Sequence, residues 1–276
     1  MSHTTLQVQM DRGVCTLTLN RPEVRNAMSM TMVQELLSAL TEAESNPQAR
    51  VVVLRGAGGH FCAGGDIGDM AQARMKLAQQ QAQLSAGETV TERNPIEAVN
   101  AAFGRLCLAY AHSSLPIVTV LEGTVMGGGF GLACVSDVSL ARDNVSFRLP
   151  ETSLGIVPAQ IAPFLVERLG YAEAKRLAVT GAKVDAQEAL TLRLVHEVRA
   201  AEASLAAALQ RTVDRILACG PKAITETKLL LARARHTSAE YLIDDAAAVF
   251  ARAVLSEEGQ EGTSAFMQKR APSWVP

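Results

Sequence analysis

The first part of the chain, up to Pro158, alternates short apolar runs with longer stretches whose apolar positions recur at helical spacing. Ser29 is placed to cap the first of these helices, and the fully apolar runs are typical of buried parallel strands. The pattern predicts strands over 6–10, 14–19, 51–54, 116–121, 138–141 and 145–148, and helices over 30–44, most of 70–112 with a break near 91–95, and a short stretch ending at 135.

After Pro158 the apolar pattern changes to a succession of amphipathic helices. These helices are predicted over 160–169, 171–179, 186–192, 202–218, 222–233, 238–253 and 257–268. A strand–helix core followed by helices indicates an α/β architecture with a helical C-terminal section. No repeat or linker-like stretch interrupts the chain, so we expect the helical section to pack on the core or on another subunit.

Composition narrows the classes of protein that fit this pattern. Of 276 residues, 48% are hydrophobic, 20% charged and only 4% aromatic, which predicts a large aliphatic core and excludes a disordered chain. The net charge is −2 and no dense basic block appears. Both observations argue against nucleic acid and anionic membrane as main partners. The longest uncharged run, 106–121, is too short to span a bilayer.

Cysteine usage indicates a cytoplasmic protein. The five cysteines are widely separated and form no C-x-x-C pair, which predicts buried thiols rather than a disulfide framework or a zinc site. They are Cys15, Cys62, Cys107, Cys134 and Cys219. The first nine residues lack the basic and apolar regions of a signal peptide.

Two glycine-rich loops, 56–65 and 127–131, each follow a predicted strand. Phe61 stands where a dinucleotide-binding G-x-G-x-x-G motif needs a small residue, and no Gly-Lys-Ser/Thr sequence supports a P-loop. One interpretation is that both loops are tight turns that require positive φ. The other is that two backbone N–H groups converge on one substrate oxygen and form an oxyanion hole.

Four motifs favour the second interpretation. NRPEVRNA at 20–27, FCAGGDI at 61–67, GGG at 127–129 and LPETSLGIVP at 149–158 occur in order, and together they resemble the enoyl-CoA hydratase/isomerase (crotonase) superfamily. The resemblance implies a crotonase-like spiral of ββα units over 1–200 and a helical trimerisation region over 201–276. It also implies a CoA thioester substrate, a homotrimer or dimer of trimers, no metal, and no cofactor apart from the CoA of the substrate.

The resemblance carries specific roles to residues of this sequence. The backbone N–H groups of Gly65 and Gly128 would form the oxyanion hole, and Glu151 would be the catalytic acid/base. Positions matching substrate or CoA contacts are Arg25, Ala27, Ala63, Gly64, Asp66, Ile67, Gly131, Phe266 and Lys269. Asp66 is also placed to cap the following helix, while His60 and Asp137 are interpreted as structural hydrogen-bonding residues.

Gly131 is a departure from the family pattern, because two-glutamate hydratases carry their first glutamate there. We expect the missing side chain to leave room for substrate or water. With PAQIAPF at 158–164, the sequence resembles bacterial hydratases of branched glutaconyl-CoA esters, a group that includes 3-methylglutaconyl-CoA and isohexenylglutaconyl-CoA hydratases of leucine and acyclic terpene catabolism. Such substrates carry a carboxylate that could replace the missing one; Arg74 and Arg93 are candidates to pair with it.

Three functions stay open at this stage. A hydratase would use Glu151 and the two amide donors to add water to a conjugated enoyl-CoA. An enoyl-CoA isomerase also needs only one carboxylate. Since a few crotonase relatives bind RNA, an RNA-binding protein is a third alternative, although the net charge of −2 and the lack of a basic aromatic stripe argue against it.

Overall fold

The computed structural model describes residues 3–275 and confirms the mixed α/β class. The larger sheet has the order β1-β2-β3-β4-β6-β9, in which β1 and β2 are antiparallel and every later pair is parallel. Its strands are β1(Leu6–Asp11), β2(Val14–Leu19), β3(Val51–Gly56), β4(Ile117–Leu121), β6(Val138–Arg142) and β9(Glu197–Arg199). A three-stranded sheet contains β5(Thr124–Met126), β7(Ser146–Arg148) and β8(Lys183–Asp185).

The helices follow the predicted succession closely. They are α1(Met30–Ser45), α2(Ile67–Ser85), α3(Pro95–Ala111), α4(Gly128–Val135), α5(Ala162–Thr180), α6(Ala186–Thr191), α7(Glu202–Ala218), α8(Pro221–Ala234), α9(Ala239–Leu255) and α10(Glu257–Met267). Ser29 caps α1 by accepting a hydrogen bond from the Met32 amide. The two helices expected over 160–179 join into α5, which kinks at Gly170, where φ is +74°.

Both faces of the larger sheet are covered. Within β3, Val52 and Leu54 face the main core, where side chains of α1 and α3 pack on the sheet. Val51 and Val53 point to the opposite face and pack with Leu205 and other apolar residues of α7. Successive side chains of a strand alternate between faces, so an all-apolar strand fits a sheet that is buried on both sides.

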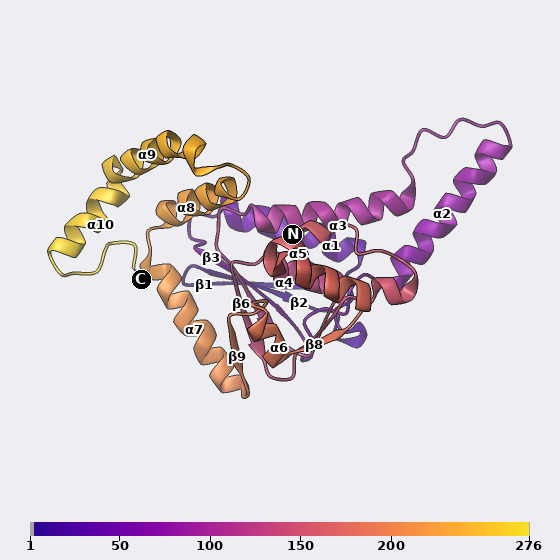
Figure 1. Ribbon diagram of the computed structural model, residues 1–276, viewed down its shortest axis with the longest axis horizontal. Helices are drawn as coiled ribbons and strands as arrows, with labels where there is room; N and C mark the ends of the chain where they lie inside the picture. Colours follow the sequence, from indigo (N-terminus) through magenta and orange to yellow (C-terminus); the bar gives the residue numbers. More distant parts are fainter. Residues whose placement is uncertain (1–2, 276) are drawn as a thin grey trace.

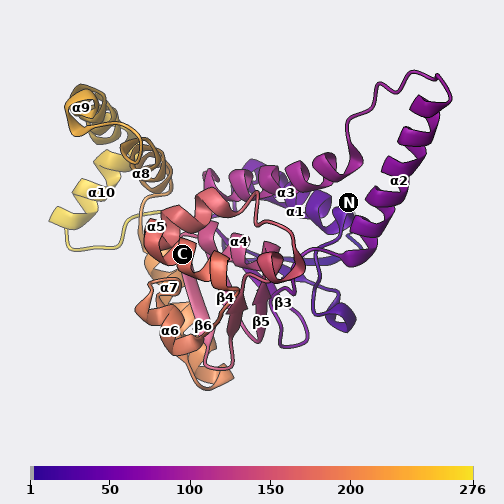
Figure 2. The same cartoon turned by 45° about the vertical axis from the view of Figure 1, so that its right-hand side comes forward.

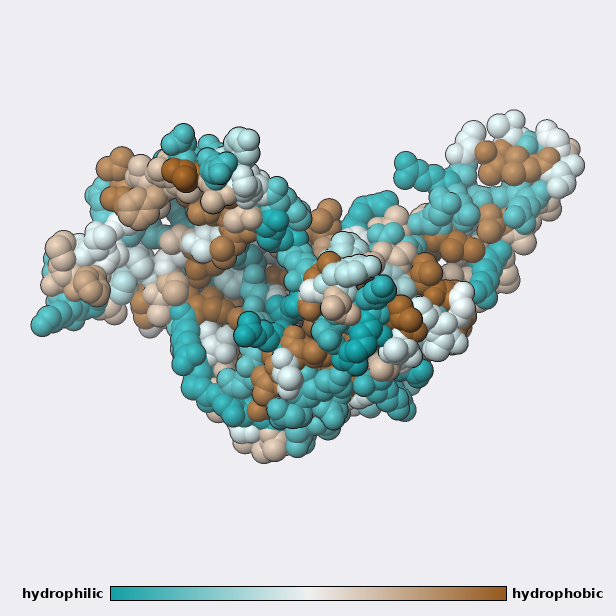
Figure 3. Space-filling model, viewed as in Figure 1, coloured by the Kyte–Doolittle hydropathy of each residue, from teal (hydrophilic) through white to brown (hydrophobic). Residues whose placement is uncertain are grey.

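Two helical segments project from this body (Figure 1). Helix α2 extends to one side, and α8, α9 and α10 form an arm on the other, as the turned view also shows (Figure 2). We call residues 221–267 the C-terminal arm. Apolar side chains gather on its surface in Figure 3. Helix α7 lies against the sheet and the arm does not. The domain division at residue 200, which groups α7 with the arm, stays a prediction.

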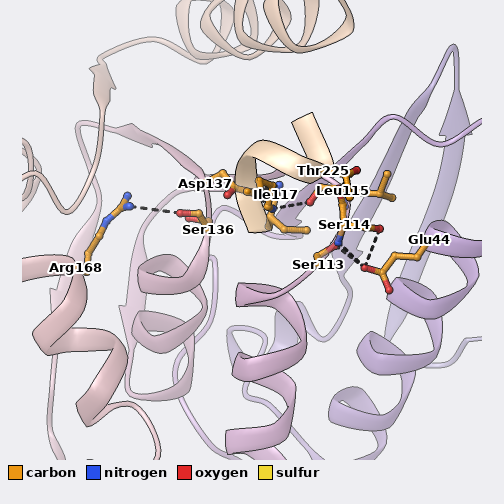
Figure 4. A network of polar contacts seen from close by, with 10 residues as sticks. Glu44, Ser113, Ser114, Leu115, Ile117, Ser136, Asp137, Arg168 and Thr225 are labelled. Atoms are coloured by element: carbon orange, nitrogen blue, oxygen red, sulfur yellow. Dashed lines mark hydrogen bonds and ion pairs between the residues drawn. The ribbon is translucent and has the colours of Figure 1, made fainter. Parts of the chain in front are cut away.

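Polar contacts fix the start of the C-terminal arm to the core (Figure 4). The hydroxyl of Thr225 in α8 donates to the carbonyl of Ser114 at 3.0 Å. The ammonium of Lys228 donates to the carbonyl of Leu115 and to the carboxylate of Asp137, which also accepts from the amide at the start of β4. Asp137 is therefore structural, as expected from the sequence.

Candidate active site

The loop after β3 is fixed on both sides of the Gly65 amide by backbone hydrogen bonds to Met28. Gly64 has φ of +100°, which favours glycine, and its carbonyl accepts from the Met28 amide at 2.7 Å. The Asp66 amide donates to the Met28 carbonyl at 3.0 Å. Within residues 3–275 the amide between these two bonds, that of Gly65, donates to no protein acceptor.

The second loop turns into helix α4. Gly127 has φ of +45°, and its amide donates to the carbonyl of Arg148 at 3.2 Å. Gly128 is the first residue of α4, and its amide has no acceptor in the described part of the chain. The two loops touch, because a Cβ added to Gly127 would lie only 3.6 Å from Cα of Gly64. The unpaired amides of Gly65 and Gly128 therefore belong to one site.

Glu151 brings a carboxylate to the same place. It opens a one-turn 3-10 helix, Glu151–Leu154, just after β7. Its Oε1 atom lies 3.0 Å from the position of a Cβ on Gly127, and its Oε2 atom is buried without a partner among the described residues. Burial raises the pKa of Glu151 above its ordinary value, because the charged form loses hydration.

These groups have complementary chemistry. Two unpaired amides at a glycine turn and a helix start can hold a carbonyl oxygen that becomes negative in the transition state. A partly buried carboxylate beside them, with a raised pKa, can take and return a proton. The arrangement can therefore stabilise an enolate and move a proton at the neighbouring carbons of an acyl thioester.

Comparison with known proteins agrees with this geometry. Residues 9–275 match the family model described as enoyl-CoA hydratase/isomerase. The chain belongs to this family. In structure it is similar to an enoyl-CoA hydratase/isomerase from Marinobacter aquaeolei, with 47% identity, a TM-score of 0.91 and 99% of each chain covered. It is also similar to Pseudomonas aeruginosa AtuE, with 46% identity, a TM-score of 0.91, and 99% of this chain and 100% of that chain covered.

Curated relatives of this hydratase/isomerase include both types of reaction. The peroxisomal Delta(3,5)-Delta(2,4)-dienoyl-CoA isomerase of Arabidopsis thaliana is 30% identical, with 99% of this chain and 98% of that protein covered. The 2,3-dehydroadipyl-CoA hydratase of Escherichia coli is 28% identical, with 98% of each chain covered. The family and its enzymatic nature are thus established. Because the relatives include both an isomerase and a hydratase, they do not decide which reaction and which acyl group belong to this chain.

At Gly131 the expectation of open space is wrong. Gly131 is buried within α4, and a Cβ there would lie 2.5 Å from Cγ2 of Ile161 and 3.4 Å from Sγ of Cys107. Ile161, which is 3% exposed, occupies the place into which a side chain at 131 would project. This hydratase/isomerase therefore lacks the first glutamate and fills its place with an aliphatic side chain.

The expected CoA-contact segment packs against the oxyanion loop. The Ala63 amide donates to the carbonyl of Arg25 at 3.0 Å, which connects 20–27 directly to 61–67. Asp66 accepts from Arg21 at 2.7 Å and caps α2 through the Gly68 amide, which confirms its capping role. The side chain of Ile67 is 86% exposed.

Phe266 and Lys269 do not join the site within this chain. Phe266 is 85% exposed at the end of α10, and Lys269 follows it on the surface. In Figure 1 the end of α10 and helix α2 lie on opposite sides of the molecule. Their contact with the CoA of a neighbouring subunit stays a prediction.

Two further side chains near the site, Asn26 and Phe103, were not assigned a role from the sequence. Asn26 is fully buried, and its amide donates to the carbonyls of Ala57 and His60, which holds the first loop. The Phe103 ring of α3 lies 3.1 Å from the position of a Cβ on Gly128. Asn26 lies inside a quoted motif, but Phe103 had no local signal. His60 accepts from the Thr124 amide at 3.1 Å, which confirms its structural role.

The structure places the two arginines proposed to pair with a substrate carboxylate on the surface. Arg74 on α2 and Arg93 in the following loop are both exposed.

Among residues 3–275 no group of three or more His, Cys, Asp and Glu side chains is arranged to hold a metal ion. Over the same residues, no helix has the length and apolar character needed to cross a membrane.

Proposed function

We propose that this family member is an enoyl-CoA hydratase. The observation that carries the proposal is that two loops with unpaired amides, at Gly65 and Gly128, touch each other and that the carboxylate of Glu151 lies beside them, next to Gly127. In the proposed reaction Glu151 takes a proton from water while the hydroxyl adds to the β carbon of the conjugated thioester. The amides hold the resulting enolate, and Glu151 returns the proton to the α carbon, so that water is added across the double bond.

We further propose a branched glutaconyl-type substrate, 3-methylglutaconyl-CoA or isohexenylglutaconyl-CoA, within leucine or acyclic terpene catabolism. Three observations support it: the motif pattern at 158–164, the absence of a carboxylate at Gly131, and a relative named for 2,3-dehydroadipyl-CoA, which is also the thioester of a dicarboxylic acid. CoA enters as part of the substrate, and the proposal needs no separate cofactor. The substrate carboxylate helps to hold the water that the missing glutamate would have held.

An enoyl-CoA isomerase is the second candidate. It is favoured by the single carboxylate, which is sufficient to move a proton between two carbons, and by the dienoyl-CoA isomerase among the relatives. The two reactions change the absorbance of the conjugated thioester in opposite directions, because hydration destroys conjugation and isomerisation of an unconjugated ester creates it.

A panel of thioesters tests the proposed function. Crotonyl-CoA, 3-methylglutaconyl-CoA and isohexenylglutaconyl-CoA are each incubated with the enzyme, and the conjugated band is followed. We expect it to decay with a higher kcat/KM for a glutaconyl ester than for crotonyl-CoA. A preference for crotonyl-CoA would overturn the substrate assignment, and conjugation gained from 3-enoyl-CoA without any hydration would favour the isomerase.

We also propose that the chain forms a homotrimer or a dimer of trimers through the C-terminal arm. Large apolar side chains of the arm are exposed, among them Ile243 at 65%, Phe250 at 71% and Leu255 at 74%, and exposed apolar patches mark association surfaces. Light scattering should give the mass of a trimer or hexamer, and Phe250→Ser should lower it.

Four buried free thiols and one exposed thiol support the cytoplasmic location that we propose.

A further inference from the structure

One face of helix α3 forms a wall beside the site. Residues three and four apart share a helix face, so Asn100, Phe103, Gly104 and Cys107 form one row. Phe103 lies against Gly128, and Cys107 lies against Gly131. Asn100 lies three residues before Phe103 along α3, a rise of roughly 4.5 Å, and Gly104 directly follows Phe103, so both continue the wall beside the ring that lies against Gly128.

Gln160 reaches this wall from the loop that follows Glu151. Its Nε2 atom donates to Oδ1 of Asn100 at 2.8 Å, and both side chains are partly buried. Its Oε1 atom occupies the space where a Cβ on Gly104 would lie, at 2.1 Å. The next residue, Ile161, fills the place beside Gly131. The carboxamide of Gln160 is thus placed by the same segment that closes the first-glutamate position.

This amide pair, Asn100 and Gln160, has hydrogen-bonding capacity left over. Each side-chain amide has two N–H donors, and their mutual bond uses one of the four. Within the described chain, the other three donors have no acceptor. Neither amide nitrogen is among the fully buried side-chain atoms that lack a partner, so the remaining donors are accessible and can serve an anion that accepts several hydrogen bonds.

We propose that the amide pair binds the distal carboxylate of the acyl group, an inference that rests on the proposed glutaconyl-type substrate. In a glutaconyl ester three carbons separate the carboxylate from the thioester carbon, and such a chain extends over a length comparable to one helix turn. With the thioester oxygen on Gly65 and Gly128, the carboxylate then reaches the pair along α3.

Neutral donors suit this position. A guanidinium beside Glu151 would favour the charged form of that carboxylate and lower its pKa, whereas an amide contributes no net charge. An amide pair recognises the substrate carboxylate and leaves the burial of Glu151 to decide its protonation. This accounts for carboxylate recognition without either of the exposed arginines, Arg74 and Arg93.

The test compares two esters that differ by one carboxylate, 3-methylglutaconyl-CoA and 3-methylcrotonyl-CoA, with crotonyl-CoA as a second neutral ester. Gln160→Met keeps the length of the side chain and removes its amide. Gly104→Ala places a methyl group where the carboxamide rests. We expect the ratio of kcat/KM, charged ester over neutral ester, to fall ten- to hundredfold in both variants, mainly through KM, as for a lost hydrogen bond to a charged group.

Gln187→Met, at an exposed position of α6, is the matched control and should keep the ratio of the wild type. A ratio that stays within twofold in Gln160→Met, or an equal loss for charged and neutral esters, would overturn the inference. Binding of saturated glutaryl-CoA and butyryl-CoA by calorimetry separates it from the proposed function. If the wild type hydrates no glutaconyl ester yet prefers glutaryl-CoA, and Gln160→Met abolishes that preference, the proposed function fails and the carboxylate site stands.

Discussion

The contact between Gly131 and Ile161 leads to a quantitative prediction about packing. In Gly131→Ala the new Cβ would lie 2.5 Å from Cγ2 of Ile161, about 1 Å closer than an ordinary carbon–carbon contact. Overpacking of this kind costs about 1–3 kcal/mol, and the gain from replacing a helix-interior glycine returns about 0.5–1 kcal/mol. We therefore expect Gly131→Ala to lower the free energy of unfolding by about 1–2 kcal/mol.

The double variant makes this expectation specific. Ile161→Ala alone removes a side chain that is 3% exposed, at a cost of about 2–5 kcal/mol. In the double variant the methyl group at 131 enters the space that Ile161 leaves, so the combined loss should be smaller than the sum by about 1–2 kcal/mol. Urea unfolding of the four proteins, followed by circular dichroism, measures this coupling.

A control pairs Gly131→Ala with Leu36→Ala, a fully buried position on α1. We expect that pair to be additive within about 0.5 kcal/mol, because a Cβ at 131 would meet Ile161 and Cys107 and not Leu36. Strict additivity of Gly131→Ala with Ile161→Ala, or a stabilising effect of Gly131→Ala alone, would refute the conclusion that Ile161 fills the first-glutamate position.

Three other predictions concern the oxyanion hole, the catalytic carboxylate and the contact of α1 with the segment before the first strand. Gly128→Val should lower kcat about 10²–10³-fold, since its Cβ meets the Phe103 ring at 3.1 Å and displaces the amide; steady-state kinetics showing less than a tenfold loss would contradict this. Burial raises the pKa of Glu151 above its ordinary value of 4.5, and a general base must be ionised to act. We therefore expect kcat/KM to fall with decreasing pH through a midpoint above 4.5. A midpoint below that value would contradict the assignment. Burial opposes ionisation of Glu35, but hydrogen bonds from Thr4 and Thr5 outweigh it and lower its pKa to about 2. Glu35→Gln should therefore destabilise the fold at pH 7 by about 1–2 kcal/mol after allowance for solvent screening, and the difference from wild type should shrink as pH falls from 4.5 towards 2; a pH-independent difference in urea unfolding would be evidence against this.

Local sequence signals were sufficient for much of the fold. Strand β2 and helix α7 have the predicted bounds, and α1 differs by one residue, because apolar periodicity and the Ser29 cap act within one element. The strands β5, β8 and β9 were not predicted. Each has three residues, too few to show a period, and each exists through pairing with a distant strand.

The residues of the candidate site also fall into those that local motifs predict and those that only long-range packing places. Gly65, Gly128 and Glu151 were found from motifs whose residues are close in sequence. Ile161 was inside a quoted segment, but its position beside Gly131 depends on how the loop after Glu151 packs on α4 and α3. Contacts of this type join residues that are far apart along the chain, so only the three-dimensional structure shows that the first-glutamate position is closed.

Hydration of 3-methylglutaconyl-CoA by wild type and Glu151→Gln tests the central claim most directly. The substitution keeps the size of the side chain and removes the group that moves the proton. The account predicts that the wild type abolishes the absorbance of the conjugated thioester, that kcat falls about 10²–10⁴-fold in the variant, and that circular dichroism and the affinity for CoA stay as in the wild type. Wild-type kcat in Glu151→Gln, with the same fold, would contradict the claim.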